Sequence, residues 1–405
     1  MFTEDVYHPD IIKFITAKTE EGRISNANIS VMVDNSFMEA VIDNNEYWTE
    51  FEGEKYKKYS ARTVFDLIIE GMWKNGEPGI LFKDRIDDSP YKYTGQEIFS
   101  TNPCSEQPLP SNGICNLGSL DLSKFIDKNK EMDFEKLEIA VKFGTRFLDE
   151  VVSKGAYPTK EIEKWADENR AIGLGIMGFA DYLLMKEIAY GSQESLDELD
   201  SILGFIDKVS KEESERAGAE LGIPKYCKKL PVPRRNITLT TCAPTGTVSL
   251  IAGSSSGIEP VFSEITIRND KTGIYTFENN LANKPYFRCA VSSNGTREVT
   301  WEEHISVLAT AQKHIQSGVS KTINFPQLTR RETMAKAAIM AWEMGCKGVA
   351  MYRNGSRKSE VLSPKNIQKD KCPICSNEMV SIEGELRCTT CTKDTIIERT
   401  MTAYD

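Results

Sequence analysis

Three side chains that could carry chemistry alternate along one proline-rich segment. Single residues separate Asn102, Cys104 and Glu106, and the neighbouring prolines disfavour a helix there. In an extended segment, alternate residues project to the same side. The sequence therefore predicts that an amide, a thiol and a carboxylate converge. Such a set suits an activated sulfur that works on a polar substrate, while the carboxylate moves a proton and the amide orients a hydroxyl. Cys115 follows in the same segment.

A second group of small polar residues follows a run of β-branched residues. Residues 236–241 have the pattern of a strand, and residues 244–249 read Pro-Thr-Gly-Thr-Val-Ser. A strand followed by a hydroxyl-rich turn and a helix start offers free backbone amides to an anion. An ordinary N-capped turn has the same pattern. The candidates for binding phosphate are Pro244, Thr245, Gly246, Thr247, Val248 and Ser249.

Two Cys-x-x-Cys pairs lie near the end of the chain, after a polar, lysine-rich stretch. The pairs are formed by Cys372 with Cys375 and by Cys388 with Cys391. This spacing is typical of a zinc ribbon, in which four thiolates hold one tetrahedral zinc ion. We therefore expect residues 358–371 to be a linker and residues 372–405 to be a cysteine-rich tail.

The composition excludes several classes of protein. A chain of 405 residues with 40% hydrophobic content can bury a sizeable core in one large domain or two smaller ones. It has no apolar run long enough to span a bilayer and no basic region followed by an apolar one at its start, so a cytoplasmic location is expected and membrane partners are not. Scattered cysteines fit a reducing compartment. The net charge of -10 argues against nucleic-acid binding by charge, but free nucleotides are still allowed.

The hydrophobic pattern predicts a mixture of strands and helices. The segment 171–180 contains closely spaced glycines but no complete dinucleotide-binding fingerprint, so close backbone packing is the better interpretation. The helix at 194–220 is highly charged and is expected to form a solvated face. His304 and His314 are too far apart in one helix to resemble a metal-binding pair, and both are expected to be structural. The expected strands are 27–33, 79–82 and 320–326, and the expected helices are 34–41, 63–74, 134–153, 194–220, 301–319 and 332–345.

Six blocks in the same order resemble the adenosylcobalamin-dependent, or class II, ribonucleotide reductases. They are Asn-Pro-Cys-Ser-Glu at 102–106, Cys-Asn-Leu-Gly-Ser at 115–119, Arg-Ala-Ile-Gly-Leu-Gly-Ile-Met-Gly-Phe-Ala-Asp at 170–181, Ala-Pro-Thr-Gly-Thr-Val-Ser at 243–249, Ser-Lys-Thr-Ile-Asn-Phe-Pro at 320–326 and Cys-Lys-Gly-Val-Ala-Met-Tyr-Arg-Asn-Gly-Ser-Arg at 346–357. The resemblance implies an α/β fold in which residues 1–357 are part of a ten-stranded barrel made from two half-sheets. The Cys104 loop would pass through the barrel's centre.

The resemblance also implies a role for each candidate residue in converting ribonucleotides to 2′-deoxyribonucleotides for DNA synthesis. Cys104 would become the thiyl radical that abstracts the ribose 3′ hydrogen. Glu106 would take the 3′-hydroxyl proton, and Asn102 would hydrogen-bond the ribose hydroxyls. Cys115 would be one of two thiols that reduce the intermediate as the 2′-hydroxyl leaves as water. The turn at 244–249 would hold the substrate phosphates.

The family's catalytic chains extend several hundred residues before the point that matches His8. By the resemblance, that region holds the partner of Cys115, the first half-barrel and the allosteric specificity site. We therefore expect this chain to be the C-terminal portion of a split enzyme, with the N-terminal half on a separate chain. A half-barrel alone would also expose unpaired strand edges, which favours a covering partner.

The sequence leaves some alternatives open. Iron-dependent relatives carry two adjacent tyrosines near the end of the barrel, whereas Tyr352 stands alone, which favours cobalamin. A fragment of an iron- or manganese-dependent large subunit, or a non-catalytic remnant that binds a partner, remains the alternative. The tail cysteines could hold zinc, or they could pass electrons from a thioredoxin-like reductant to the pair that includes Cys115. Diphosphate and triphosphate substrates are not distinguished.

Overall fold

Two sets of parallel strands meet in one sheet. The computed structural model describes residues 1–18, 24, 27–270, 273–292, 295–356, 362–364, 379–382 and 385–388. In the first set, β1 (Phe2–Asp5), β2 (Ile29–Val33) and β5 (Gly79–Phe82) run parallel. In the second set, β12 (Thr322–Phe325) runs parallel to β13 (Gly348–Arg353). Because β13 pairs antiparallel with β5, the sheet order is β1-β2-β5-β13-β12.

The second set continues beyond β12 through an irregular segment. Cys242 bridges Val319 just before β12, and Thr240 bridges Leu174 in β9 (Ile172–Met177). β9 in turn pairs parallel with β8 (Asn116–Asp121). The wall therefore runs β8, β9, residues 238–242, β12, β13, β5, β2, β1. Among the described residues, no strand pairs with the outer side of β1 or of β8.

Residues 236–241 do not form the predicted regular strand. Their backbone follows β9, with Leu174 N donating to Leu239 O at 2.8 Å. The carbonyls of Asn236 and Ile237 instead accept hydrogen bonds from the Arg234 guanidinium, at 2.9 and 2.8 Å. Since these acceptors are taken by a side chain, the ladder is interrupted and only isolated bridges remain.

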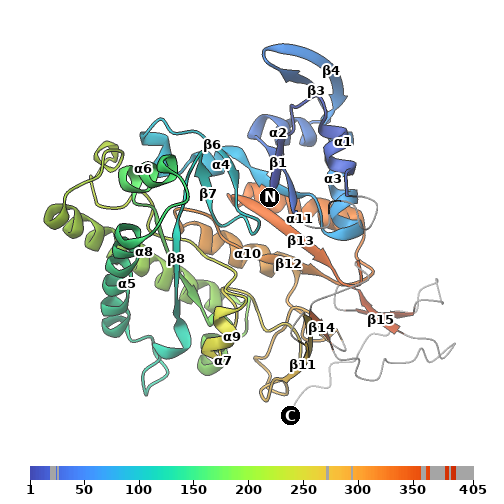
Figure 1. Ribbon diagram of the computed structural model, residues 1–405. Coiled ribbons are helices and arrows are strands. Elements are labelled where there is room, and N and C mark those ends of the chain that lie inside the picture. The colour runs from blue at the N-terminus through green and yellow to red at the C-terminus, as the bar shows by residue number, and fades with distance from the viewer. Residues whose placement is uncertain are drawn as a thin grey trace.

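Helices cover the wall (Figure 1). Most of the predicted helices are confirmed to within about two residues, which is the usual uncertainty of helix ends. The helix predicted at 301–319 stops at Gln312, because the following residues extend to reach Cys242. The helices are α1 (Ile11–Thr16), α2 (Asn35–Ile42), α3 (Ala61–Asn75), α4 (Lys83–Asp87), α5 (Phe134–Lys154), α6 (Lys160–Asn169), α7 (Phe179–Lys186), α8 (Gln193–Leu221), α9 (Val248–Ala252), α10 (Trp301–Gln312) and α11 (Arg331–Glu343).

The long charged helix predicted at 194–220 is present as α8, and its charged residues form the expected solvated face. One side of α8 is buried, including Leu199, Ile202 and Ile206. α8 packs against α5, where the rings of Phe134 and Phe205 lie 4.9 Å apart. Its charged residues occupy the remaining faces, so α8 is a long amphipathic helix.

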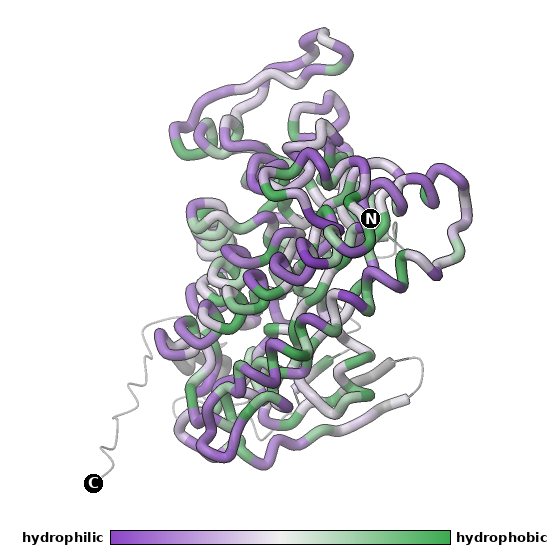
Figure 2. The backbone as a smooth tube through the Cα atoms, turned by 90° about the vertical axis from the view of Figure 1, so that its left-hand side faces the viewer, coloured by the Kyte–Doolittle hydropathy of each residue, from purple (hydrophilic) through white to green (hydrophobic). Residues whose placement is uncertain are grey.

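The remaining strands form small sheets around the wall. β3 (Glu46–Phe51) and β4 (Glu54–Ser60) make a projecting hairpin that is largely hydrophilic (Figure 2). β6 (Ile98–Thr101) pairs with β7 (Pro108–Pro110), and β10 (Ile265–Asp270) pairs with β11 (Gly273–Glu278). β14 (Leu362–Pro364) also pairs with β10, so part of the expected linker is a strand of this small sheet. No helix of the described residues is long and apolar enough to cross a membrane.

The glycines of β9 allow a close approach between backbones, which confirms the packing interpretation. A Cβ on Gly175 would lie 2.0 Å from the carbonyl oxygen of Thr241, and one on Gly173 would lie 2.6 Å from the Thr241 methyl group. Any larger residue would push residues 238–242 away from β9. These glycines therefore set the spacing of the wall beside the candidate site.

Candidate active site

The segment with Asn102, Cys104 and Glu106 is the tip of the β6–β7 hairpin. Its backbone turns tightly: Ser105 N donates to Asn102 O at 3.0 Å, and Ser105 has a positive φ of 66°. The tip is therefore a turn and not the extended segment that the alternation argument assumed. Three prolines in a short stretch exclude a helix but do not require an extended chain.

The hairpin tip is fixed to the wall through the main chain of Glu106. Its carbonyl oxygen accepts hydrogen bonds from Thr241 Oγ1 at 2.9 Å and from Gly318 N at 2.8 Å. A Cβ on Gly318 would lie 2.4 Å from the carbonyl oxygen of Ser105, so only glycine allows this approach. Both contacts come from the segments that flank the bridge between Cys242 and Val319, so the tip lies against that part of the wall.

The Glu106 carboxyl group is buried, and one of its oxygens, Oε2, has no hydrogen-bond partner among the described residues. Burial raises the pKa of Glu106, and a hydrogen bond from the Asn102 side chain acts in the opposite direction. Asn102 Oδ1 accepts from Gln107 N at 3.0 Å, which fixes the amide beside the carboxylate. The sequence prediction that these two groups converge is consistent with this contact, although the backbone differs.

The thiols of Cys104 and Cys115 both lie near Glu106, but they differ in their exposure to solvent. Cys104 is exposed at the tip, and Cys115 is half-buried at the start of β8, where its Sγ donates to Asn116 O at 3.5 Å. Burial, followed by the nearby Glu106 carboxylate, raises the pKa of both thiols. Both sulfurs therefore carry hydrogen at neutral pH. A protonated thiol is a poor nucleophile but can give up a hydrogen atom.

The turn at 244–249 leads from the wall into α9. Gly257 N donates to Thr245 Oγ1 at 2.8 Å, and the hydroxyls of Ser249 and Ser256 lie 3.0 Å apart. These hydroxyls hold the turn closed. Gly246, Thr247 and Val248 are exposed, whereas Thr245 and Ser249 are buried and Pro244 is half-buried. The part of the turn that can meet an anion is therefore the exposed stretch from Gly246 to Val248.

Sequence reasoning missed Gln107 and Thr241. The Gln107 side chain is buried, and neither its oxygen nor its nitrogen has a hydrogen-bond partner in the described part of the chain. Its position directly after Glu106 was a usable signal. Thr241 looked like an ordinary strand residue, and nothing in the sequence indicated that its hydroxyl holds the hairpin tip.

The remaining residues singled out in the sequence are the tail cysteines and two histidines. Cys372, Cys375 and Cys391 are outside the described residues, and for Cys388 only the backbone at the end of β16 (Glu385–Cys388) is described. His304 is fully buried, and His314 Nε2 lies 3.1 Å from Asp200 Oδ1. No group of three or more His, Cys, Asp or Glu side chains within the described ranges is arranged to hold a metal ion.

The family comparison agrees with this geometry. The family described as "Ribonucleotide reductase, barrel domain" matches residues 1–229 and 231–352. The chain belongs to the ribonucleotide reductase family. The match covers both strand sets of the wall, the hairpin with Cys104 and the turn at 244–249.

Curated ribonucleotide reductases resemble the chain over most of its length. A "Vitamin B12-dependent ribonucleoside-diphosphate reductase" from Thermoplasma acidophilum is 37% identical, over 90% of this chain and 52% of the relative. The protein of the same name from Mycobacterium tuberculosis is 32% identical, over 89% of this chain and 56% of the relative. The chain therefore spans about half the length of the curated relatives it matches.

A solved reductase has the same fold. The "Actinobacillus ureae class Id ribonucleotide reductase alpha subunit" superposes with a TM-score of 0.71, over 87% of this chain and 70% of the other. Its sequence is 22% identical. At that identity the likeness concerns the fold alone.

Proposed function

We propose that this chain is the C-terminal part of the catalytic chain of an adenosylcobalamin-dependent ribonucleotide reductase. The observation that carries the proposal is the neighbourhood of Glu106: its buried carboxylate, on a hairpin tip fixed to the wall, lies near the protonated thiols of Cys104 and Cys115. The family membership and the names of the curated relatives support the same reaction.

In this proposal each residue has a defined role in the reaction. The thiyl radical on Cys104 takes the 3′ hydrogen atom of the ribose, and Glu106 accepts the 3′-hydroxyl proton. The 2′-hydroxyl then leaves as water. Cys115 and a second thiol supply two electrons and two protons and become a disulfide, and Cys104 returns its hydrogen atom to the 3′ carbon. Asn102 orients the ribose hydroxyls, and the amides of Gly246 and Thr247 hold the phosphates.

The Cys104 thiol fits a reaction that begins at adenosylcobalamin, because the thiol is exposed and its raised pKa keeps the S–H bond intact. Adenosylcobalamin, when bound, would supply a carbon radical able to take a hydrogen atom from a thiol. A buried thiolate would not serve this chemistry. Glu106 also favours the neutral thiol, since a second negative charge beside its carboxylate is unfavourable.

We propose further that the N-terminal part of the family's catalytic chain, on a companion chain, completes the barrel. The wall has eight strand positions among the described residues, and a ten-stranded barrel needs two more between β1 and β8. The sequence expectation placed the whole first half-barrel on the companion. In the structure, β1, β2 and β5 already form a parallel set that runs antiparallel to β12 and β13. The open outer sides of β1 and β8 need a covering chain.

Exposed apolar side chains on α5 support the same companion. Ile139, Phe143, Phe147 and Val151 recur every four residues and form one stripe, with the rings of Phe143 and Phe147 stacked at 6.2 Å. α5 is the helix that follows the open strand β8. The helices of this chain lie outside its strands, so the helix of a two-strand unit beside β8 would lie next to α5 and could cover this stripe.

For the tail we propose structural zinc held by Cys372, Cys375, Cys388 and Cys391. β15 (Met379–Ile382) and β16 form an antiparallel hairpin between the two Cys-x-x-Cys pairs, as a zinc ribbon requires. Elemental analysis should find one zinc per chain. The variant Cys388→Ser should then keep turnover with thioredoxin as the reductant. Loss of only the thioredoxin-supported turnover in a zinc-free chain would instead make the tail a redox shuttle.

The reaction is tested by mixing this chain with its N-terminal companion, adenosylcobalamin and a ribonucleoside diphosphate or triphosphate. Deoxyribonucleotide formation should require all components and should stop in Cys104→Ser. Activity with an iron or manganese radical subunit, and none with adenosylcobalamin, would assign the chain to the other reductase class. Activity from this chain without the companion would rule out the split enzyme.

A further inference from the structure

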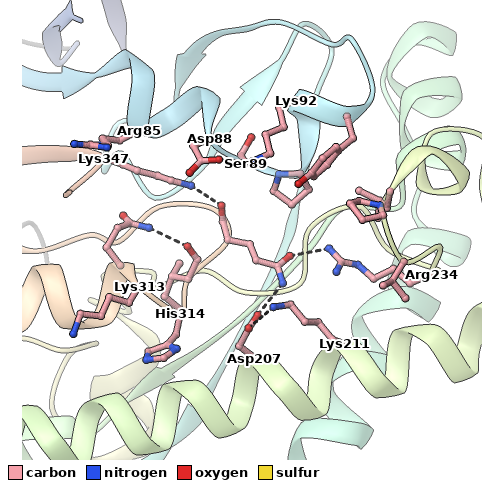
Figure 3. A pocket seen from close by; sticks show the side chains of 18 of the residues that line it. Arg85, Asp88, Ser89, Lys92, Asp207, Lys211, Arg234, Lys313, His314 and Lys347 are labelled. Atoms are coloured by element: carbon pink, nitrogen blue, oxygen red, sulfur yellow. Dashed lines mark hydrogen bonds and ion pairs between the residues drawn. The ribbon is translucent and has the colours of Figure 1, made fainter. Parts of the chain in front are cut away.

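A cavity of about 650 Å³ lies at the end of the wall opposite the turn at 244–249. Its lining comes from residues that follow β5 and from residues that precede β12, β13 and the segment 238–242. The turn at 244–249 lies after that segment, at the other ends of the strands. The long helix α8 supplies one side of the cavity, through Asp207 and Lys211 (Figure 3).

Cationic side chains outnumber carboxylates in this cavity. The cations are Arg85, Lys92, Lys211, Arg234, Lys313 and Lys347, and the carboxylates are Asp88, Asp207 and Glu215. Lys92 pairs with Asp88 and Lys211 pairs with Asp207, each at 2.5 Å. Among the described residues, Arg85, Arg234 and Lys347 form no ion pair. The cavity therefore carries an excess of positive charge, although Asp88 attracts Lys347, and Asp207 and Glu215 attract Arg234, without forming ion pairs.

Two of these three cations are deeply placed and are held only by neutral groups. Arg234 and Lys347 are each 8% exposed. Lys347 Nζ donates to the carbonyl oxygens of Gln316 and Ser317 at 2.6 and 2.8 Å. Arg234 Nη2 donates to Gln316 Oε1 at 3.0 Å, so Gln316 anchors both cations at one place.

Burial of these charges is unfavourable without an anion. It lowers the pKa of Lys347 to about 8 and also lowers the pKa of Arg234. Carbonyl oxygens satisfy hydrogen bonds but do not neutralise a charge, so an anion in the cavity would offset much of the desolvation cost.

Two polar atoms of residues that line the cavity have no hydrogen-bond partner among the described residues. Ser89 Oγ is buried, and so is Arg85 Nε, and neither makes a hydrogen bond within the described part of the chain. Both residues lie in the stretch that follows β5, with Asp88, whose pKa is lowered by Lys92, Lys347 and Arg85. A hydroxyl and a guanidinium are groups that bind phosphate oxygens.

We propose that this cavity binds a small molecule that carries two or more phosphate groups. A ligand with several charges is favoured over a single carboxylate, because the unpaired cations come from three separate segments and the volume exceeds that of one small anion. The competing explanation is that Arg234 and Lys347 only satisfy backbone carbonyls. That explanation accounts for neither Ser89 nor Arg85, and it predicts no binding. The proposal does not depend on the reductase activity.

The experiment is calorimetric titration of the whole chain at pH 7 with inorganic pyrophosphate, alongside AMP and ADP. Wild type should bind pyrophosphate, and Arg85→Gln should weaken binding by about tenfold or more, the usual effect of losing a charge-assisted hydrogen bond. Lys211→Gln should weaken it less. Lys208→Gln is the matched control: it removes a lysine from the same helix that does not line the cavity, and affinity should not change.

The titrations with AMP and ADP show which kind of molecule carries the phosphates. ADP binding that is lost in Arg85→Gln, with AMP binding weakly, would make the ligand a nucleotide. Pyrophosphate binding without ADP binding would make it a smaller polyphosphate. Absence of pyrophosphate binding to wild type, or equal affinity in Arg85→Gln and Lys208→Gln, would overturn the proposal. Circular dichroism of each variant separates lost binding from lost folding.

Discussion

The two thiols of the candidate active site share a raised pKa but differ in their exposure to solvent, and this difference fits the separate roles that we propose for them. Cys104 is exposed at a turn, where an external radical source can reach it, whereas Cys115 is half-buried at the start of a strand. The Glu106 carboxylate near both thiols is buried, and one of its oxygens has no hydrogen-bond partner among the described residues. A buried carboxylate without a cation is unfavourable in the unliganded state, and a hydroxyl of the substrate would supply the missing hydrogen bond.

Replacing each thiol should stop the reaction at a different stage. Cys104→Ser should reduce turnover by more than about a thousandfold, because an oxygen radical is far harder to form than a thiyl radical. Cys115→Ser should also stop turnover, yet it should still exchange the substrate's 3′ hydrogen, since Cys104 remains. The measurement is deoxyribonucleotide formation beside release of tritium from 3′-labelled substrate, with the N-terminal companion present. Full multiple turnover in either variant would remove the assignment.

Glu106 should make the stability of this chain depend on pH. Burial raises the pKa of Glu106 in the folded state, so the folded chain binds this proton more tightly than the unfolded chain does. Stability is therefore lost as pH rises from the ordinary glutamate pKa of about 4.3 to the raised folded value. Glu106→Gln lacks this loss. The unfolding free energy of Glu106→Gln minus that of wild type should therefore increase through that pH range and then stay constant.

Urea unfolding of this chain alone, at several pH values, measures the difference. The control removes an exposed carboxylate: Glu135→Gln, at the first turn of α5, changes a side chain that folding does not bury. A constant difference between Glu106→Gln and wild type at all pH values would mean that the carboxylate is not buried as described.

At the scale of elements, periodicity predicted what depends on local sequence and failed where distant groups intervene. The helices α3, α5 and α11 follow from their apolar spacing and appear within about two residues of the prediction. Residues 236–241 have strand composition, but Arg234 takes two of their carbonyls, and no local pattern reports that. The hairpin tip was predicted as a loop, while its turn depends on Ser105 and on the contact with Gly318.

Gly175 should be the most sensitive glycine of the wall. In Gly175→Ala the new methyl group would overlap the Thr241 carbonyl oxygen, so residues 238–242 must move. Thr241 would then lose its hydrogen bond to the Glu106 carbonyl oxygen. We expect a loss of about 1–3 kcal/mol in unfolding free energy, the usual effect of overpacking. Gly246→Ala is the control, because its methyl group would meet nothing within 4 Å. It should change stability by less than about 0.5 kcal/mol. Equal stability of the two variants would contradict this packing.

At the scale of the whole molecule, the strand order could not be derived from the sequence. The antiparallel contact between β5 and β13 joins segments more than 250 residues apart, and only two residue pairs define it. Composition and periodicity carry no information about such a pairing. The resemblance supplied the barrel, but it led us to expect the whole first half-sheet on another chain, whereas β1, β2 and β5 already form a parallel set that runs antiparallel to β12 and β13. A gap is left between β1 and β8, because no strand of the described residues pairs with their outer sides.

The last prediction concerns the companion that we expect to fill this gap. If its outer helix packs on α5, the apolar stripe should become buried on association. Phe143 is 70% exposed in this chain, so Phe143→Ser should leave the chain's own stability nearly unchanged. It should weaken association with the N-terminal companion by roughly tenfold, as truncating a buried aromatic anchor does. Leu221→Ser, at the exposed end of α8, is the matched control. Sedimentation velocity measures both. If Phe143→Ser binds the companion as tightly as Leu221→Ser, the stripe lies outside the interface, and the open edges of β1 and β8 alone must hold the two chains together.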